Sequence, residues 1–167
     1  GDTLVIYDDT GTLTLFDLKS REIIHIIDSE EYTRYAFSGC TFLGKDKFAY
    51  SNAENDICIY DLNERTIVKT IDIPYASTLY ADSEGKYLLT ELLDGDYAVY
   101  DGETFEELGV TPKVQTDNYI EGPFVFSDGT MVCGYTSGRE FGSQEYTLYF
   151  IDLNTMQTIS TYSMSNK

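Results

Sequence analysis

The stretch ICIYDLNERTIVKTID, from Ile57 to Asp72, decides the fold. An apolar run ends at Asp61, a polar turn follows at residues 63–65, and a second strand-like run completes it. Three other stretches have the same order: LTLFDLKSREIIHIID from Leu13, YAVYDGETFEELGVT from Tyr97 and LYFIDLNTMQTISTY from Leu148. Repeats of roughly 40 to 50 residues built from short strands are the sequence signature of a β-propeller.

Each copy ends its apolar run on an aspartate, namely Asp17, Asp61, Asp101 or Asp152, at spacings of 44, 40 and 51 residues. A short carboxylate at a strand end accepts backbone N–H bonds within a turn. A catalytic group is needed once, whereas these aspartates recur in every unit. We therefore interpret them as turn formers.

With the aspartate-ending run as the third of four strands, labelled a to d, each unit becomes one propeller blade. The predicted first strands, a, lie at residues 34–37, 78–80 and 123–126, whereas the first unit lacks a strand a. We expect one propeller over residues 1–167, with blades at about 1–28, 33–72, 77–111 and 119–163. The predicted fold is all-β: a partial β-propeller of about four four-stranded antiparallel blades.

A partial propeller leaves blade faces and strand edges exposed, which favours association. Two explanations stay open at this stage. The chain is a piece of a longer propeller, or copies of it self-associate through open blade faces.

Composition limits the classes of partner. The 167 residues carry a formal net charge of −18, which repels nucleic acid and anionic membrane surfaces. A protein or a small neutral or basic ligand stays compatible with this charge. No apolar run has the roughly 18 to 20 residues of a membrane helix, so we expect no membrane insertion. No signal segment is visible, and cytoplasmic and extracellular locations both stay open.

The repeats resemble WD40-type and YVTN-type propeller repeats over nearly the whole chain. The matching runs are LFDL at Leu15–Leu18, IYDL at Ile59–Leu62, VYDG at Val99–Gly102 and FIDL at Phe150–Leu153. The Trp-Asp and Gly-His pairs of WD40 repeats are absent, so the hydrogen-bond network of that family cannot form. The pattern is closer to looser bacterial propellers, which include scaffolds, surface proteins, lactonases and quinoprotein-like dehydrogenases. The resemblance implies the fold and leaves the function open.

In such a blade, the loops between strands b and c and the loops between blades lie on one face, here called the loop face. The a–b and c–d turns lie on the opposite face, here called the turn face. The loop face is predicted to be acidic, with Glu91 among its acids. Binding is predicted for three loop tyrosines and their charged neighbours: Tyr32, Tyr75, Tyr119, Glu30, Glu31, Asp94, Asp96 and Arg139. The alternatives are a solvated acidic surface and tyrosines packed between blades.

Catalytic and metal-binding patterns are sparse. His25 is the only histidine and lies within the strand IIHII, where a structural role is favoured. The three cysteines are odd in number and far apart, which predicts buried free thiols. We therefore predict no catalytic residue, no metal ligand and no cofactor. The predicted function is a non-catalytic scaffold for protein or ligand binding. The alternative is a fragment of a lactonase- or quinoprotein-like enzyme whose catalytic residues lie mostly outside this chain.

Overall fold

The computed structural model describes residues 2–8, 12–27, 39–52, 54–73, 78–92, 95–114, 120–137 and 145–165. Within these ranges the chain forms strands β1 to β15 and no helix. The strands make one three-stranded and three four-stranded antiparallel sheets. Each sheet uses strands that are consecutive in the sequence, as a propeller blade does.

The strand bounds follow the repeat. The first sheet contains β1 (Thr3–Tyr7), β2 (Leu13–Asp17) and β3 (Glu22–Ile27). The second contains β4 (Cys40–Leu43), β5 (Lys47–Ser51), β6 (Ile57–Asp61) and β7 (Thr66–Ile71). The third contains β8 (Leu79–Ala81), β9 (Tyr87–Glu91), β10 (Tyr97–Asp101) and β11 (Glu107–Val110). The fourth contains β12 (Ile120–Val125), β13 (Thr130–Ser137), β14 (Glu145–Asp152) and β15 (Gln157–Ser165).

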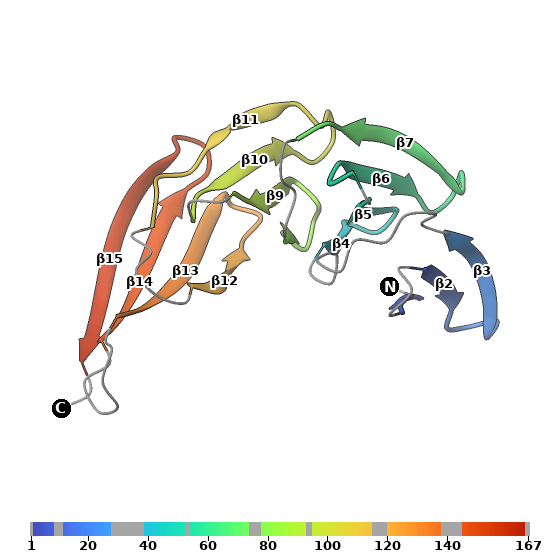
Figure 1. Cartoon of the computed structure of the whole chain (residues 1–167), viewed down its shortest axis with the longest axis horizontal. Coiled ribbons are helices and arrows are strands. Elements are labelled where there is room, and N and C mark those ends of the chain that lie inside the picture. The colour runs from blue at the N-terminus through green and yellow to red at the C-terminus, as the bar shows by residue number, and fades with distance from the viewer. Residues whose placement is uncertain are drawn as a thin grey trace.

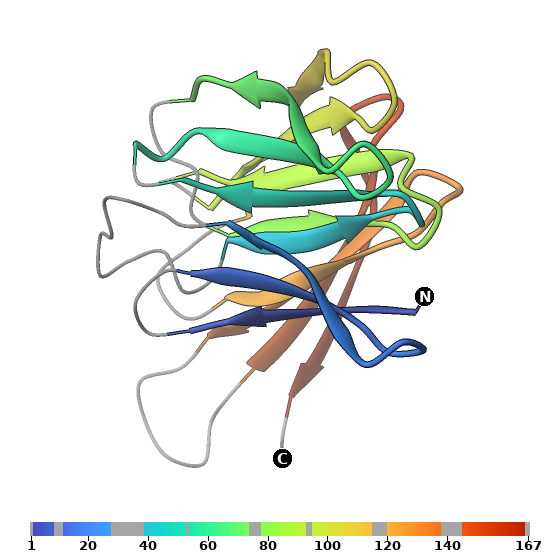
Figure 2. The same cartoon turned by 90° about the vertical axis from the view of Figure 1, so that its right-hand side faces the viewer.

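The four sheets stand side by side in an arc (Figure 1). Strands β4, β8 and β12 lie on the concave side, where β8 contacts both of the others. Strands β3, β7, β11 and β15 lie on the convex side. The ends of the strands that the b–c loops join lie at the opposite end of the sheets from the turns of the c–d hairpins (Figure 2). This arrangement confirms the prediction of a partial propeller of four blades, the first with three strands.

One predicted strand is displaced. The innermost strand of the second sheet is β4, whereas the sequence predicts residues 34–37, which lie outside the described ranges. The β4 register runs from Cys40 opposite Tyr50 to Leu43 opposite Lys47. A short turn joins the two strands, with Gly44 at a φ of 68°. The run at 34–37 has the composition of a strand. The strand that pairs with β5, however, is the run just before Gly44, which is nearer to β5 in the sequence.

Three apolar clusters join neighbouring sheets. Leu13 and Leu15 of the first sheet pack with Phe48 and Tyr60 of the second. The opposite face of the second sheet packs on the third through Ala49, Ile57, Ile59, Leu88, Ala98 and Tyr100. The third sheet packs on the fourth through Leu89, Tyr97, Val99, Met131, Cys133 and Ile151. Strands β6 and β10 are therefore buried on both faces, as their continuous apolar runs predict.

The four repeated aspartates form the c–d turns, which confirms their interpretation. Asp17 Oδ1 accepts the N–H of Lys19 at 2.7 Å and that of Ser20 at 3.0 Å. Asp61 and Asp101 accept the corresponding pairs of N–H groups, and Asp152 accepts the N–H of Asn154. Four positions after each aspartate, the chain has positive φ without glycine, at Arg21, Arg65, Phe105 and Met156.

These hydrogen bonds stabilise the ionised carboxylates. The N–H groups of Thr104 and Glu103 lower the pKa of Asp101, with Thr104 contributing most. Backbone donors also lower the pKa of Asp17 and Asp152. Each of these groups therefore stabilises the fold above its unfolded pKa, and the contribution is lost as the pH falls through the lower folded value.

The a–b turns of adjacent sheets meet backbone to backbone at the turn face. A Cβ on Gly85 would overlap the amide nitrogen of Gly44, and a Cβ on Gly102 would overlap the Gly85 carbonyl oxygen. Gly85 has a φ of 73°, which side chains rarely adopt. Gly44 and Gly85 thus allow the second and third sheets to approach closely at this end, and Gly102 allows the c–d turn of the third sheet to pack on its a–b turn.

We expect Arg65→Gly to stabilise the protein by about 0.5–1 kcal/mol, because glycine removes the cost of positive φ in an L-residue. The measurement is chemical denaturation at pH 7. The matched control is Lys69→Gly, which places glycine within β7 and should destabilise by a similar amount. Equal changes in the free energy of unfolding for Arg65→Gly and Lys69→Gly would contradict the cost assigned to the positive φ of Arg65.

We expect Asp101→Asn to lower Tm at pH 7, because the amide accepts the two turn N–H bonds more weakly than the carboxylate does. The Tm difference between the variant and the parent should begin to shrink as the pH falls below 3.8 and should vanish as the pH passes through the lower folded pKa, where the folded parent carboxylate becomes protonated. Thermal unfolding followed by circular dichroism from pH 2 to 7 measures this. A pH-independent difference would refute the role of the charge.

Candidate functional site

Of the predicted binding residues, the structure describes Asp96. The others lie outside the described residues: Tyr32, Tyr75, Tyr119, Glu30, Glu31, Asp94 and Arg139. Their binding role stays a prediction. The candidate site consists of described residues at the same end of the sheets (Figure 2).

The described side chains of the two faces differ in charge. The loop face carries the acids Asp8, Glu54, Asp56, Asp72, Glu91 and Asp96. Lys113 is the one basic residue in the described loops of this face. The turn face mixes acids with the basic residues Lys19, Arg21, Lys45, Lys47, Arg65 and Lys86. In the described part of the chain, the loop face is thus distinguished by its scarcity of basic residues, whereas the turn face carries more acids together with these six bases.

The b–c hairpins at this face share one closing hydrogen bond. Asp8 N–H donates to Thr12 O at 3.2 Å, Asn52 N–H to Asp56 O at 2.9 Å, and Leu92 N–H to Asp96 O at 2.8 Å. Because this hydrogen bond recurs, equivalent residues of successive hairpins lie at the same distance from the loop face. Strand alternation then determines which neighbouring sheet each side chain faces.

Polar side chains occupy the loop-face end of the junction between the second and third sheets. Ser51 follows Ala49 by two residues in β5, and Thr90 follows Leu88 by two in β9, so both face this junction. Ser51 Oγ and Thr90 Oγ1 are shielded from solvent and have no hydrogen-bond partner among the described residues. Asp96 Oδ1, in the b–c hairpin of the third sheet, is likewise shielded from solvent and has no hydrogen-bond partner among the described residues. Buried polar atoms normally have partners, so these oxygens are candidates for ligand or water contacts.

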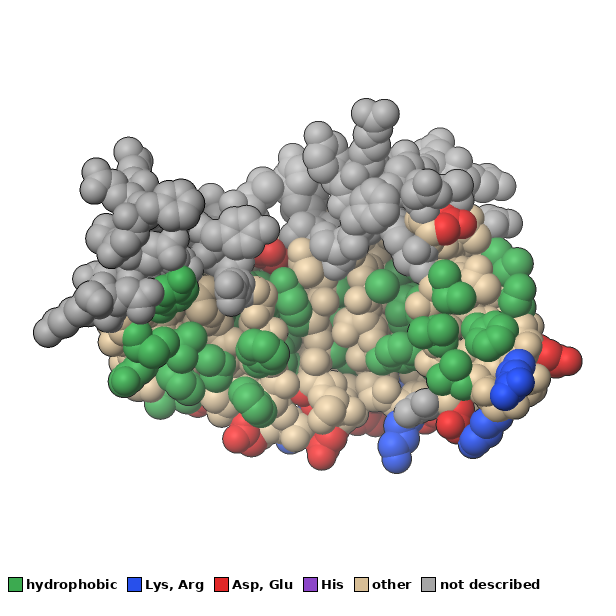
Figure 3. Space-filling model, turned by 90° about the horizontal axis from the view of Figure 1, so that it is seen from below, with side chains coloured by type: hydrophobic (Ala, Val, Ile, Leu, Met, Phe, Trp, Pro, Cys, Tyr) green, Lys and Arg blue, Asp and Glu red, His purple; other side chains and the backbone are tan. Residues whose placement is uncertain are grey.

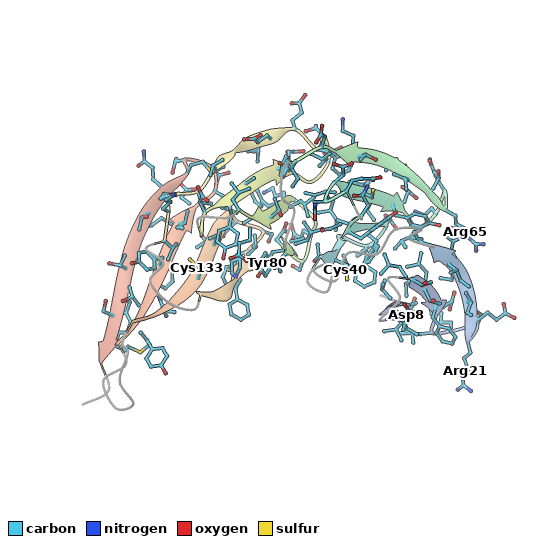
Figure 4. All side chains as sticks on the ribbon, viewed as in Figure 1. Asp8, Arg21, Cys40, Arg65, Tyr80 and Cys133 are labelled. Atoms are coloured by element: carbon cyan, nitrogen blue, oxygen red, sulfur yellow. The ribbon has the colours of Figure 1, made fainter. Side chains whose placement is uncertain are left out.

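A carboxylate and two phenols occupy the loop-face end of the next junction, between the third and fourth sheets. Glu91 lies opposite Tyr97 in the β9–β10 register, so their side chains share a face. The ring of Tyr80 meets that of Tyr97 edge to face at 6.0 Å. The Tyr80 hydroxyl lies against Gly122 of β12, where a Cβ would be 2.7 Å away. Tyr80 and Cys133, labelled in Figure 4, mark the two sides of this junction.

Burial dominates the electrostatics of this cluster. It raises the pKa of Glu91 above the ordinary value of 4.5. Burial, followed by the charge of Glu91, raises the pKa of both Tyr80 and Tyr97. The phenols are therefore neutral at pH 7, and the Tyr97 hydroxyl has no hydrogen-bond partner among the described residues. A half-buried carboxylate beside two aromatic rings fits a cationic group, through ion pairing and cation–π attraction.

Sequence reasoning placed Glu91 on the acidic face but did not identify this cluster. The available signal was that Glu91 ends one strand and Tyr97 begins the next, on either side of a short hairpin. Tyr80 comes from another strand, and its position relative to Glu91 depends on the sheet pairing of β8 with β9.

The described residues also define the histidine and the cysteines. The His25 ring stacks on Tyr60 at 5.4 Å, the structural role that its mid-strand position predicts. Cys58 and Cys133 are buried free thiols, as predicted, but Cys40 is exposed. Within the described ranges, no group of three or more His, Cys, Asp and Glu side chains could hold a metal ion. Nor does any helix there have the length and apolar character to span a membrane.

Comparison with known proteins identifies the fold. No protein-family model matches the sequence, and no curated protein matches it either. The computationally designed Ika8 protein aligns with a TM-score of 0.71 and 18% identity over 97% of this chain. The C-terminal WD40 domain of Sif2 gives 0.63 and 15% over 99%, and a chain of the mitotic checkpoint complex gives 0.68 and 12% over 97%.

The chain spans 46%, 44% and 48% of those three chains, respectively, which is less than half of each. These likenesses, together with the four antiparallel sheets, show a WD40-like β-propeller fold. The similarity concerns the fold and not the activity.

We expect Glu91→Gln to raise the stability of the protein at pH 7. The raised pKa means that the ionised carboxylate destabilises the fold, and that stability falls as the pH rises from 4.5 through the folded pKa. The neutral amide removes this cost, and the two proteins should converge below pH 4.5. Urea denaturation at several pH values measures the difference. A less stable variant at pH 7 would contradict the burial of this charge.

Proposed function

We propose that the chain is a non-catalytic propeller module that binds a protein partner at its loop face, through a basic side chain of that partner. The observation that carries this proposal is the half-buried Glu91 beside Tyr80 and Tyr97. Aromatic rings and a desolvated carboxylate together fit an arginine or lysine side chain, because each attracts a cation and both strengthen as water is excluded.

The charge of the chain supports the same class of partner. A net charge of −18, with a single basic residue in the described loops of the loop face, accelerates the approach of a basic surface and disfavours an acidic one. The sequence adds further predicted contacts: Asp96 and the loop residues Tyr32, Tyr75, Tyr119, Glu30, Glu31, Asp94 and Arg139. Their positions in the loops between blades or strands are typical of binding residues on a rigid scaffold.

The destabilising burial of Glu91 is a second supporting argument. A carboxylate with a raised pKa costs folding free energy that a neutral residue would not. Carboxylates whose pKa is strongly shifted by burial concentrate at functional sites. Within the described ranges, no feature favours the alternative of a propeller enzyme.

The test uses three fluorescently labelled peptides of equal length, one lysine- and arginine-rich, one neutral and one acidic. Fluorescence anisotropy at low ionic strength should show binding of the basic peptide. Glu91→Gln should weaken that binding by about tenfold, which corresponds to ~1.4 kcal/mol for a charged contact. Acidification through the raised pKa of Glu91 should weaken it as well, because the carboxylate becomes neutral.

The matched control is Glu103→Gln, which removes one negative charge from an exposed position on the turn face. Its effect on affinity should be small, because a distant exposed charge is screened by salt. Equal losses in the two variants would mean that only net charge matters and would refute the site. Binding of the acidic peptide as tightly as the basic one would refute the class of partner.

A further inference from the structure

The first and fourth sheets each expose one apolar face. The N-terminal open face consists of Leu4 and Ile6 of β1, Phe16 of β2, and Ile23 and Ile26 of β3. The C-terminal open face consists of Phe124 of β12, Val132 of β13, Leu148 and Phe150 of β14, and Tyr162 and Met164 of β15. Phe124 is 74% exposed and Ile23 is 58% exposed. Seen from below the arc, hydrophobic side chains gather at both of its ends (Figure 3).

The N-terminal open face repeats a surface that is buried elsewhere in the chain. Phe16 immediately precedes Asp17 and lies opposite Leu4, just as Tyr60 immediately precedes Asp61 and lies opposite Phe48. Phe48 and Tyr60 are 1% and 2% exposed, because they pack against the first sheet. The open face of the first sheet is therefore in the position that faces the preceding blade.

The C-terminal open face repeats the other side of such a junction. Phe150 lies two residues before Asp152 and opposite Val132, just as Val99 lies two residues before Asp101 and opposite Leu89. Leu89 and Val99 are fully buried against the fourth sheet. The open face of the fourth sheet is therefore in the position that faces the following blade.

At each internal junction, the face that one sheet turns toward the next sheet packs on the face that the next sheet turns back toward it. The C-terminal open face is of the first kind, and the N-terminal open face is of the second kind. The chain covers 46% of the designed Ika8 protein at a TM-score of 0.71, so its arc corresponds to about half of that structure. We propose that a second copy of this chain docks on both open faces at once. The C-terminal open face of each copy packs on the N-terminal open face of the other, and the four sheets of each chain form a closed two-fold ring.

A second copy fits these surfaces because it supplies both complementary faces in one body. Two identical junctions then form together, and formation of the first raises the effective concentration for the second. The side chains that define the faces are apolar or aromatic, so their burial drives association. The net charge of −18 on each chain opposes it, so added salt should tighten the pair.

The experiment measures mass in solution by sedimentation equilibrium across a dilution series and at two salt concentrations. The expected species is a dimer with twice the 18.9 kDa of the chain. Phe124→Glu and Leu4→Lys should each give a monomer, because each places a charge in both junctions of a pair. Leu108→Glu, at an exposed position of β11 outside the open faces, is the control and should stay dimeric.

Mixing the two monomeric variants gives a sharper test of the geometry. In a mixed pair, one junction is entirely parental and the other combines the new Glu with the new Lys. The mixture should therefore form a dimer that neither variant forms alone. Far-UV circular dichroism shows that each variant is folded.

Three results would overturn the proposal. One is a parent chain that stays at 18.9 kDa at high concentration and high salt, which would assign the open faces to other propeller blades and not to a second copy of this chain. Another is that the Phe124→Glu variant or the Leu4→Lys variant stays dimeric, because the proposed dimer needs both open faces of each chain. The third is a failure of the folded variants to pair on mixing, which would indicate packing between two faces of the same kind.

Discussion

The structure depends on burying both faces of the second and third sheets. Strands such as β6 and β10 are apolar at consecutive positions, so neither face of their sheets is suited to water. Stacking the sheets side by side satisfies both faces at once. The backbone contact between Gly44 and Gly85 then brings the second and third sheets together at the turn face. The arc follows from face-to-face burial combined with this local approach.

Carboxylates have different tasks at the two ends of the sheets. At the turn face, Asp17, Asp101 and Asp152 accept backbone N–H bonds that lower their pKa, so their charge contributes to folding. At the loop face, burial raises the pKa of Glu91, so its charge opposes folding. The first arrangement recurs with the repeat, as a structural device does. The second occurs at one junction, which is what a specific binding site requires.

The sequence predicts what is local and repeated. The Asp-ending strands and their turns could be recognised because each repeats, and because the turn hydrogen bonds join residues two or three positions apart. The position of β4 was missed because an innermost strand is specified by pairing with β5 more than by its own composition. The cluster around Glu91 was missed for a similar reason. Tyr80 and Gly122 reach it from different sheets, so no spacing in the sequence brings them together.

The binding cluster and the open end of the arc share one strand. β12 carries Gly122, which lies against the Tyr80 hydroxyl, and Phe124, which belongs to the C-terminal open face. A second copy that covers Phe124 would restrain β12 from one side, and a cation held between Glu91 and the tyrosines would restrain it from the other. If both proposed events favour the same placement of β12 against β8, thermodynamic reciprocity requires each to strengthen the other. The two proposals together therefore predict that association of two chains and recognition at the loop face are coupled.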